Sequence, residues 1–456
     1  MQQKDFTKGP IAKSLLSFFF SMLLANILQQ FYSFADMVII GKGLGDTAVA
    51  AVGNFTTFSF FVTGFVMGVT NGFSIVISQA YGEKDFAALR RAAASSVKLC
   101  ALSALFLTGI GLWCLHPVLH LMQTEQTLIR DCLSYGYICF GGLAITIFYN
   151  LLSAVLRAVG DSRTPLLAIA VSSGVNIGLD LLLLYGFDSG VAGPALATVM
   201  AQLVSVAICG SRLYKMEEFR LGKCDFICDR KLEWELLRNG VPMALMNAVT
   251  SVGCIFVQGC INGCGIAYTS AYSVCNKYLN LFMLPGITLG FDVSAFTGQN
   301  FGAGELERIR SGMRAAGVVA FASSLILGAT LFSFSEPLAG LMLAGREAVG
   351  YTSLFLKLLA VFLVLLNLLF VFRSCVQGMG KPAVPMYSGI VEMAVRIGVI
   401  FWGLPVLGFA AAVYAEGAAW AGALALNLAA YLFCLRGKET VGTDGKSAAG
   451  ETKFRL

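Results

Sequence analysis

The sequence predicts an all-α integral membrane protein with twelve transmembrane helices, arranged as two six-helix lobes that are related by a parallel internal repeat. Three observations lead to this fold class. The 456 residues are 57% hydrophobic and only 13% charged, whereas soluble domains carry about 25% charged residues. Apolar segments of about 20 residues or more, enough to cross roughly 30 Å of hydrocarbon as helices, follow one another along the chain. Finally, the two halves of the sequence resemble each other.

Twelve apolar segments form the predicted spans. In order they lie at 14–40, 48–80, 93–115, 131–156, 164–186, 191–211, 240–262, 268–298, 315–335, 350–372, 384–407 and 409–435. The longest polar stretch separates the sixth span from the seventh. We therefore expect an N-terminal lobe over 1–212, a cytoplasmic connector over 213–236, a C-terminal lobe over 237–436 and a polar tail over 437–456.

Positive charge in the loops predicts the orientation of the spans. With both termini in the cytoplasm, the inner segments hold 25 Lys and Arg residues and the outer loops hold only Lys42, Arg130 and Arg346. Cytoplasmic loops of membrane proteins carry this excess of positive charge. The same bias accounts for the formal net charge of +6, so no nucleic-acid partner is expected.

An internal repeat relates the two halves at a constant offset of 220 residues. The segment "SQAYGEKDFAALRR" after the second span matches "GQNFGAGELERIRS" after the eighth, and "VGDSRTP" after the fourth matches "MGKPAVP" after the tenth. The aligned pairs are Gln79 and Gln299, Gly82 and Gly302, Arg90 and Arg310, Gly160 and Gly380, Pro165 and Pro385, and Gly45 and Gly265. Because each copy holds an even number of spans, both copies enter the membrane in the same direction, as in transporters built from parallel repeats.

Polar residues at one depth of the first lobe form the strongest candidate site. Asp36 in the first span, Asp180 in the fifth and Thr198 in the sixth lie one to two turns below the outer ends of their helices. Asn176 lies one turn from Asp180 on the same helix face. Intramembrane acids are costly and usually functional, and clustered oxygens suit a proton or a small hard cation. Hydrogen bonding between helices is the alternative role for Asn176 and Thr198 taken singly.

The second lobe carries a different set of charges. Glu392 and Arg396 are four residues apart in the eleventh span, and Glu416 lies in the twelfth. An acid and a base at this spacing neutralise each other, so we interpret the three as a structural charge network. Arg396 is the repeat counterpart of Asn176, which leaves ion chemistry to the first lobe. Asp292 in the eighth span is a further candidate for lining a central substrate cavity.

Several motifs resemble those of bacterial multidrug and toxic compound extrusion (MATE) transporters. They are "QQFYSFADMVIIGKGLG", "ISQAYGEKD", "TGQNFGAGE", "VLRAVGDSRTP", and "GIVEMAVRIG" followed by "YAEGAAW". The resemblance spans about residues 8–436. It implies an antiporter in the bacterial cytoplasmic membrane, functional as a monomer, that exports amphipathic or cationic small molecules by alternating access in exchange for protons or sodium ions, with no other cofactor.

The resemblance also assigns residues. Asp36, Asn176, Asp180 and Thr198 match the coupling residues of the family's first lobe, while Gln29, Tyr32 and Asn150 fall where polar residues line the substrate cavity of relatives. A second branch of the family binds sodium through acids in the seventh and tenth helices. Here those spans offer only Gln258, Asn262, Asn367 and Lys357, so the resemblance favours coupling through the first lobe.

Two alternative functions have weaker support in the sequence. A flippase of the same superfamily, moving a lipid-linked saccharide or cell-wall precursor, would need several basic residues for a pyrophosphate, and only Lys277, Lys357 and Arg396 are candidates. A membrane-embedded enzyme would need a nucleophile motif, a metal cluster or a phosphate loop. None of these motifs occurs in the sequence, so we expect no enzymatic activity.

Overall fold

A computed structural model describes residues 4–121, 126–227 and 229–444. The first lobe is built from α1 (Ile11–Leu44), α2 (Asp46–Glu83), α3 (Phe86–Leu121), α4 (Gln126–Gly141), α5 (Leu143–Ala158), α6 (Arg163–Leu181), a π-helical turn η1 (Leu182–Gly186) and α7 (Ala192–Tyr214). Two short 3₁₀ turns, η2 (Glu217–Phe219) and η3 (Lys223–Phe226), lie in the connector. The second lobe is built from α8 (Arg230–Asn262), α9 (Ile266–Phe282), α10 (Leu284–Gly302), α11 (Leu306–Gly340), α12 (Arg346–Gly378), α13 (Ala383–Leu407) and α14 (Ala410–Asp444).

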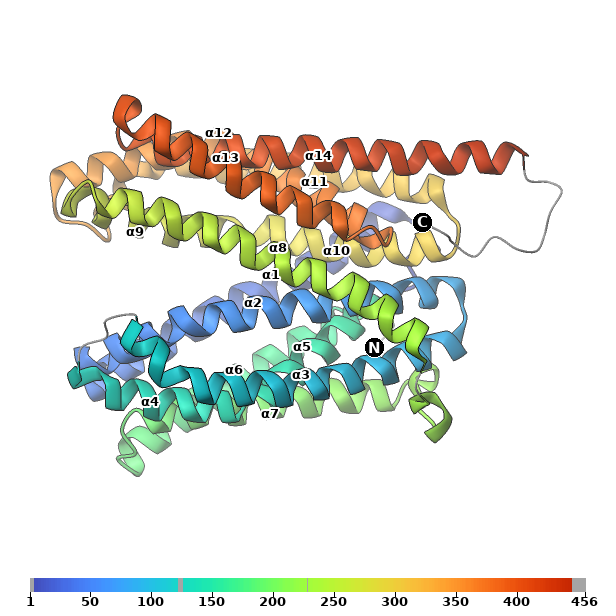
Figure 1. Ribbon diagram of the computed structural model, residues 1–456, viewed down its shortest axis with the longest axis horizontal. Coiled ribbons are helices and arrows are strands. Elements are labelled where there is room, and N and C mark those ends of the chain that lie inside the picture. Colours follow the sequence, from blue (N-terminus) through green and yellow to red (C-terminus); the bar gives the residue numbers. More distant parts are fainter. Residues whose placement is uncertain (1–3, 122–125, 228, 445–456) are drawn as a thin grey trace.

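The predicted fold class is confirmed. Eleven segments of the described chain are long and apolar enough to cross a membrane, and the bent pair α4 and α5 brings the number to twelve. The described residues contain no β-strand. Figure 1 shows α2–α7 on one side of the molecule and α9–α14 on the other, with α1 and α8 between them.

Two predicted spans are broken helices. The span at 131–156 bends by 48° between α4 and α5, where Gly141 and Gly142 adjoin and a helix is easily interrupted. The span at 268–298 divides into α9 and α10 at Met283, two residues before Pro285 in the first turn of α10. Proline has no N–H to continue the helix and is favoured in its first turn, so the break lies where the sequence permits it.

Helices α1 and α8 each pack against both lobes. The first half of α1 buries Leu15, Phe18 and Met22 against Phe296 of α10, whereas Ile40 near its end lies in the first-lobe core. Conversely, α8 begins with Leu236 in the first-lobe core and continues into the second-lobe core. Figure 1 shows α8 running obliquely from one lobe to the other. Each of these two helices therefore begins packed against the opposite lobe, and this packing joins the two lobes.

The repeat is visible in the backbone as well as in the sequence. Gly45 and Gly265 have φ angles of 85° and 108°, and Gly160 and Gly380 have φ angles of 82° and 74°. These left-handed conformations are accessible to glycine at little cost. Each pair occupies equivalent turns of the two lobes, which explains why glycine recurs at an offset of 220.

Symmetry-related glutamines join the lobes. Gln79 Nε2 donates to the Gly378 carbonyl at 2.8 Å, and Gln299 Nε2 donates to the Ala158 carbonyl at 2.7 Å. Both donors and both acceptors are separated by 220 residues, so the two bonds are copies of one interaction. We call this end of the molecule, formed by the turns at 84–85, 159–162, 303–305 and 379–382, the closed end.

Two glycines allow α2 and α10 to approach closely at the closed end. A Cβ atom on Gly82 would lie 1.9 Å from the Gln299 carbonyl oxygen, and one on Gly302 would lie 2.1 Å from the Gln79 carbonyl oxygen. Farther along, Asn26 Nδ2 of α1 donates to Thr288 Oγ1 of α10 at 2.7 Å. Interlobe contacts thus gather in the half of the molecule at the closed end.

Candidate functional site

Two acidic side chains from different helices meet inside the first lobe. Asp36 on α1 is 9% exposed and Asp180 on α6 is fully buried. Their carboxyl groups lie close enough to interact with each other. One oxygen of each, Oδ1, has no hydrogen-bond partner among the described residues. The two acids that the sequence places at one depth are therefore neighbours with unused acceptor capacity.

Local backbone features bring these acids together. A Cβ atom on Gly43 of α1 would lie 2.1 Å from Leu184 Cδ2 of η1, so glycine allows α1 to pack tightly on the turn that follows α6. Asp180 is the second-last residue of α6, and the π-helical turn begins at Leu182. Single π-helical turns are frequent at functional sites because they shift the helix face locally.

Asn176 and Thr198 lie beside Asp180, as the helical spacing of Asn176 and the depth of Thr198 predict. Asn176 is fully buried. In the amide orientation that satisfies its neighbours, Asn176 Nδ2 donates to Asp180 Oδ2 at 2.8 Å, and its side-chain oxygen accepts from the Thr198 N–H at 3.2 Å. Tyr32, one turn before Asp36 on α1, lies near the Thr198 side chain. We call Asp36, Asn176, Asp180 and Thr198 the N-lobe cluster.

The N-lobe cluster has the chemistry of a site for a proton or a small cation. Two carboxyl groups this close repel each other when both are ionised, and a bound proton or cation removes that repulsion. Oxygen ligands from carboxylate, carboxamide and hydroxyl groups suit hard cations. In the described residues no three His, Cys, Asp or Glu side chains are grouped as a metal site. A sodium ion at the N-lobe cluster would therefore need the carboxamide oxygen of Asn176 and the hydroxyl oxygen of Thr198 in addition to the two carboxylates.

The residues proposed to line a substrate cavity occupy different surroundings. Gln29 is exposed and Asn150 is half-buried, with Asn150 Nδ2 donating to the Thr146 carbonyl at 2.9 Å. Asp292 is fully buried on α10, and neither of its carboxylate oxygens has a hydrogen-bond partner in the described chain. The charge of Lys4 acts on it from the N-terminal segment, so Asp292 lies toward the closed end and away from the N-lobe cluster.

The second lobe contains a buried network of alternating charges. Glu416 Oε2 accepts a hydrogen bond from Arg396 Nη2 at 2.8 Å, with both side chains almost fully buried. Glu392 lies 3.9 Å from the same Arg396 nitrogen. Its other oxygen pairs with Arg373. We call Arg373, Glu392, Arg396 and Glu416 the charge network; with two acids and two bases it is neutral.

Arg373 was missed as a member of this network. It stands near the end of a predicted span, where an arginine is typical of a cytoplasmic loop, and the loop-charge count assigns it there. In the structure it is buried within α12. Arg157, counted in the same way, also belongs to a helix, α5, and its guanidinium lies 4.8 Å from the ring centroid of Phe291.

Polar residues of the seventh and tenth spans are hydrogen-bonded within their own span or to a neighbouring one. Gln258 Nε2 donates to Asn262 Oδ1 at 2.7 Å, and Asn276 Nδ2 donates to Gln258 Oε1 at 3.4 Å. Asn367 Nδ2 donates to Ser324 Oγ at 2.7 Å. These contacts are all made between neutral amide and hydroxyl groups.

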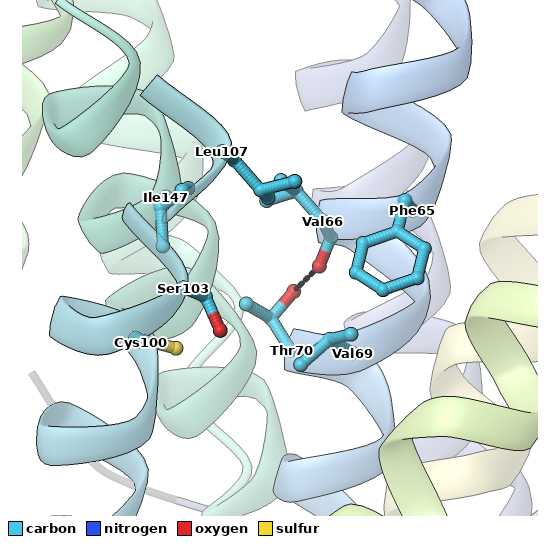
Figure 2. A pocket seen from close by; sticks show the side chains of 8 residues that line it. All are labelled: Phe65, Val66, Val69, Thr70, Cys100, Ser103, Leu107 and Ile147. Carbon is cyan, nitrogen blue, oxygen red and sulfur yellow. Dashed lines mark hydrogen bonds between the residues drawn. The ribbon is translucent and has the colours of Figure 1, made fainter. Parts of the chain in front are cut away.

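A small cavity lies within the first lobe, apart from the N-lobe cluster. Figure 2 shows its lining, which comes from α2, α3 and α5 and consists of Phe65, Val66, Val69, Thr70, Cys100, Ser103, Leu107 and Ile147. The Thr70 hydroxyl donates to the Val66 carbonyl at 2.9 Å. A mainly apolar lining whose threonine bonds within its own helix offers little for recognising an ion.

Comparison with known proteins gives one family and several relatives. The MatE family model matches residues 21–182 and 242–402, two segments that end 220 residues apart. A probable multidrug resistance protein of Bacillus subtilis, YoeA, is 30% identical over 75% of this chain and 76% of its own. A probable multidrug resistance protein of Thermotoga maritima, NorM, is 24% identical over 82% of each chain.

Solved structures show the same fold at low identity. A crystal structure of MATE in complex with MaL6 superposes with a TM-score of 0.88 at 21% identity, covering 97% of this chain and 100% of the other. An outward-facing multidrug resistance MATE family transporter of the MOP superfamily gives a TM-score of 0.88 at 22% identity, with coverage of 97% and 99%.

Proposed function

Because the chain belongs to the MatE family, we propose that it is a secondary active multidrug efflux antiporter. It exports amphipathic or cationic small molecules in exchange for protons or sodium ions by alternating access. The relatives whose names describe multidrug resistance or export support the substrate class. The antiport mechanism rests on residues of this chain.

The observation that carries the proposal is the pair of buried carboxyl groups in the N-lobe cluster. Asp36 and Asp180 adjoin, and each retains an oxygen without a partner. Leaving buried polar atoms unpaired costs free energy, so a purely structural acid pair is an expensive arrangement. A site that takes up and releases an ion accounts for the cost, because the ion pairs with those oxygens when it is bound.

Ion occupancy would bias the position of α1. With the ion bound, the carboxyl groups of Asp36 and Asp180 are compensated and α1 packs against α6. Release of the ion leaves two like charges adjacent, which favours separation of the two helices at that level. Since α1 also contacts the second lobe through Asn26, a movement of α1 couples the N-lobe cluster to the interlobe contacts.

The interlobe contacts support one arrangement of the alternating cycle. They gather at the closed end, which holds the first described residues and the end of α14 (Figure 1). We place this end in the cytoplasm of a bacterial cell, in the cytoplasmic membrane, from the distribution of Lys and Arg. The arrangement then corresponds to a state closed to the cytoplasm, and the protein works as a monomer because each chain contains both lobes.

Gradient-driven export by purified protein tests this function. Proteoliposomes loaded with a cationic fluorescent dye receive an imposed proton or sodium gradient, with the pH and the sodium concentration varied independently. We expect export to require one of the two gradients. We also expect Asp36→Asn and Asp180→Asn to abolish the response to it, because an amide neither binds a proton in this range nor carries the charge that holds a cation.

Asp188→Asn is the matched control. Asp188 is exposed in the loop after η1 and has a φ angle of 48°, a conformation that asparagine also tolerates. The same chemical change outside the cluster should leave export intact. Full gradient-driven export by both cluster variants would show that the N-lobe cluster does not couple transport to an ion.

A further inference from the structure

The N-terminal segment Lys4–Gly9, which we call the strap, lies at the closed end between the lobes. Phe6 is fully buried, and its ring makes edge contacts with Phe18 of α1 at 5.5 Å and with Phe296 of α10 at 5.8 Å between ring centroids. An apolar side chain held in this way anchors a segment that precedes the first helix.

Polar side chains of the second lobe bind the backbone of the strap. The Phe6 N–H donates to Gln299 Oε1 at 3.0 Å. The Phe6 carbonyl accepts from Asn300 Nδ2 at 3.2 Å and from Arg308 Nη2 at 2.9 Å. Arg308 Nη2 also donates to the Gly9 carbonyl at 3.2 Å. The strap is thus fixed by specific bonds to α10 and α11.

The strap also contacts the first lobe. A Cβ atom on Gly160, in the turn between α5 and α6, would lie 2.1 Å from the Lys4 carbonyl oxygen. Only glycine leaves room for the strap here. Gln299 completes the link, because the bond from Phe6 to its Oε1 turns its Nε2 toward the Ala158 carbonyl of the first lobe, at 2.7 Å. The strap therefore orients a side chain that joins the two lobes.

The repeat supplies an internal comparison. At the offset of 220, Asp5 and Phe6 correspond to Asp225 and Phe226 of the connector, yet Phe226 is 47% exposed. The positions equivalent to Asn300 and Arg308 are Ala80 and Ala88, which cannot donate side-chain hydrogen bonds. The dipeptide occurs in both halves, but of the residues that bind it only Gln299 has an equivalent in the first lobe, whereas Asn300 and Arg308 do not.

We propose that the strap is a one-sided latch of the closed end: it positions Gln299 for its bond to Ala158 and so holds the lobes together until the strap is displaced. This inference extends the proposed function, since opening of the closed end is one step of alternating access. It assigns Phe6, Gly160 and Arg308 as positioning residues for that step, none of which belongs to the N-lobe cluster.

The interlobe distance at the closed end measures the latch directly. Spin labels are attached to ketone-bearing unnatural residues placed at Ala87 and Ala303, two exposed positions on opposite lobes, and their separation is measured by double electron–electron resonance in the full-length protein. Phe6→Ala, Gly160→Ala and Arg308→Ala are each expected to raise the fraction with the longer distance at least about tenfold. Phe6→Ala and Arg308→Ala remove contacts made in the closed state, and the Cβ added by Gly160→Ala meets the Lys4 carbonyl oxygen.

Two matched controls accompany these variants. Phe226→Ala removes the exposed repeat counterpart of Phe6. Gly45→Ala introduces backbone strain comparable to that of Gly160→Ala, at a φ of 85° instead of 82°, in a turn where no atom lies within 4 Å of the added Cβ. Both should leave the distance distribution unchanged. Variants are compared only as monodisperse protein. Any one of the three strap variants that folds is sufficient to test the latch.

The outcomes separate the latch from the proposed function. A longer distance in the strap variants alone supports the latch even if the protein exports no dye, in which case only the antiport proposal fails. An unchanged distribution in the strap variants, or an equal shift in the controls, overturns the latch whatever the transport result.

Discussion

Removing the Glu416 carboxylate should destabilise the second lobe, because the buried Arg396 guanidinium loses its nearest charged partner. Glu416 Oε2 lies 2.8 Å from Arg396 Nη2, with side-chain exposures of 4% and 2%, so water screens this pair little. Two unit charges about 4 Å apart attract by about 4 kcal/mol at an effective dielectric constant near 20. Loss of one partner of a buried pair typically costs about 3 to 5 kcal/mol. We expect a cost in this range for Glu416→Gln.

This cost is measurable as a thermal shift in detergent. An unfolding entropy of about 2.1 cal/mol/K per residue gives roughly 1 kcal/mol/K for a chain of 456 residues, so the midpoint should fall by about 3 to 5 °C. Glu307→Gln is the control. Glu307 pairs with Arg310 at 2.5 Å but is 80% exposed, and loss of a surface pair should shift the midpoint by less than about 1 °C.

The double variant Glu416→Gln with Arg396→Gln tests the cause. It removes one acid and one base, leaving Arg373 paired with Glu392, and neutrality is restored. We expect most of the lost stability to return. A double variant no more stable than Glu416→Gln would refute the electrostatic explanation. A stable double variant that loses gradient-driven export would show instead that the charge network takes part in coupling.

Two further predictions concern topology and packing. Cys224 in the connector and Cys264 in the turn before α9 are both exposed. A membrane-impermeant maleimide should label Cys224 only in inside-out vesicles and Cys264 only in right-side-out vesicles. The reverse labelling pattern would show that the predicted orientation is wrong. Gly82→Ala should weaken the closed end, because its Cβ would meet the Gln299 carbonyl oxygen at 1.9 Å. Gly109→Ala, with no atom within 4 Å, should have no such effect on the interlobe distance, and equal effects would argue against tight packing of α2 on α10.

The sequence predicts the fold well because hydropathy and an even-numbered repeat constrain it strongly. Hydropathy does not show where a span bends or breaks. The sequence at Gly141 and Gly142, or before Pro285, stays apolar through the break, so a window that averages about 19 residues passes over it. The π-helical turn after Asp180 is equally invisible, since its residues are Leu, Tyr and Gly.

The candidate site was predictable in part. Depth along a helix follows from residue number, and depth alone brought Asp36, Asp180 and Thr198 to one level. The face that a side chain presents depends on helix rotation, so the sequence does not show which neighbours surround Asp292, which is fully buried on α10. Likewise, the repeat identified Gln79 and Gln299 as equivalent, but only the packed lobes reveal that equivalent residues meet across the interface.

The ratio of uphill to downhill transport tests the central claim most directly. Proteoliposomes with Asp180→Asn are assayed twice, once for dye accumulation against its gradient under an imposed ion gradient and once for exchange of dye at equal concentrations on both sides. We predict that the variant retains exchange and loses uphill accumulation, because the lobes still alternate but no ion drives them. Uphill accumulation equal to that of the unmodified protein would contradict coupling through the N-lobe cluster.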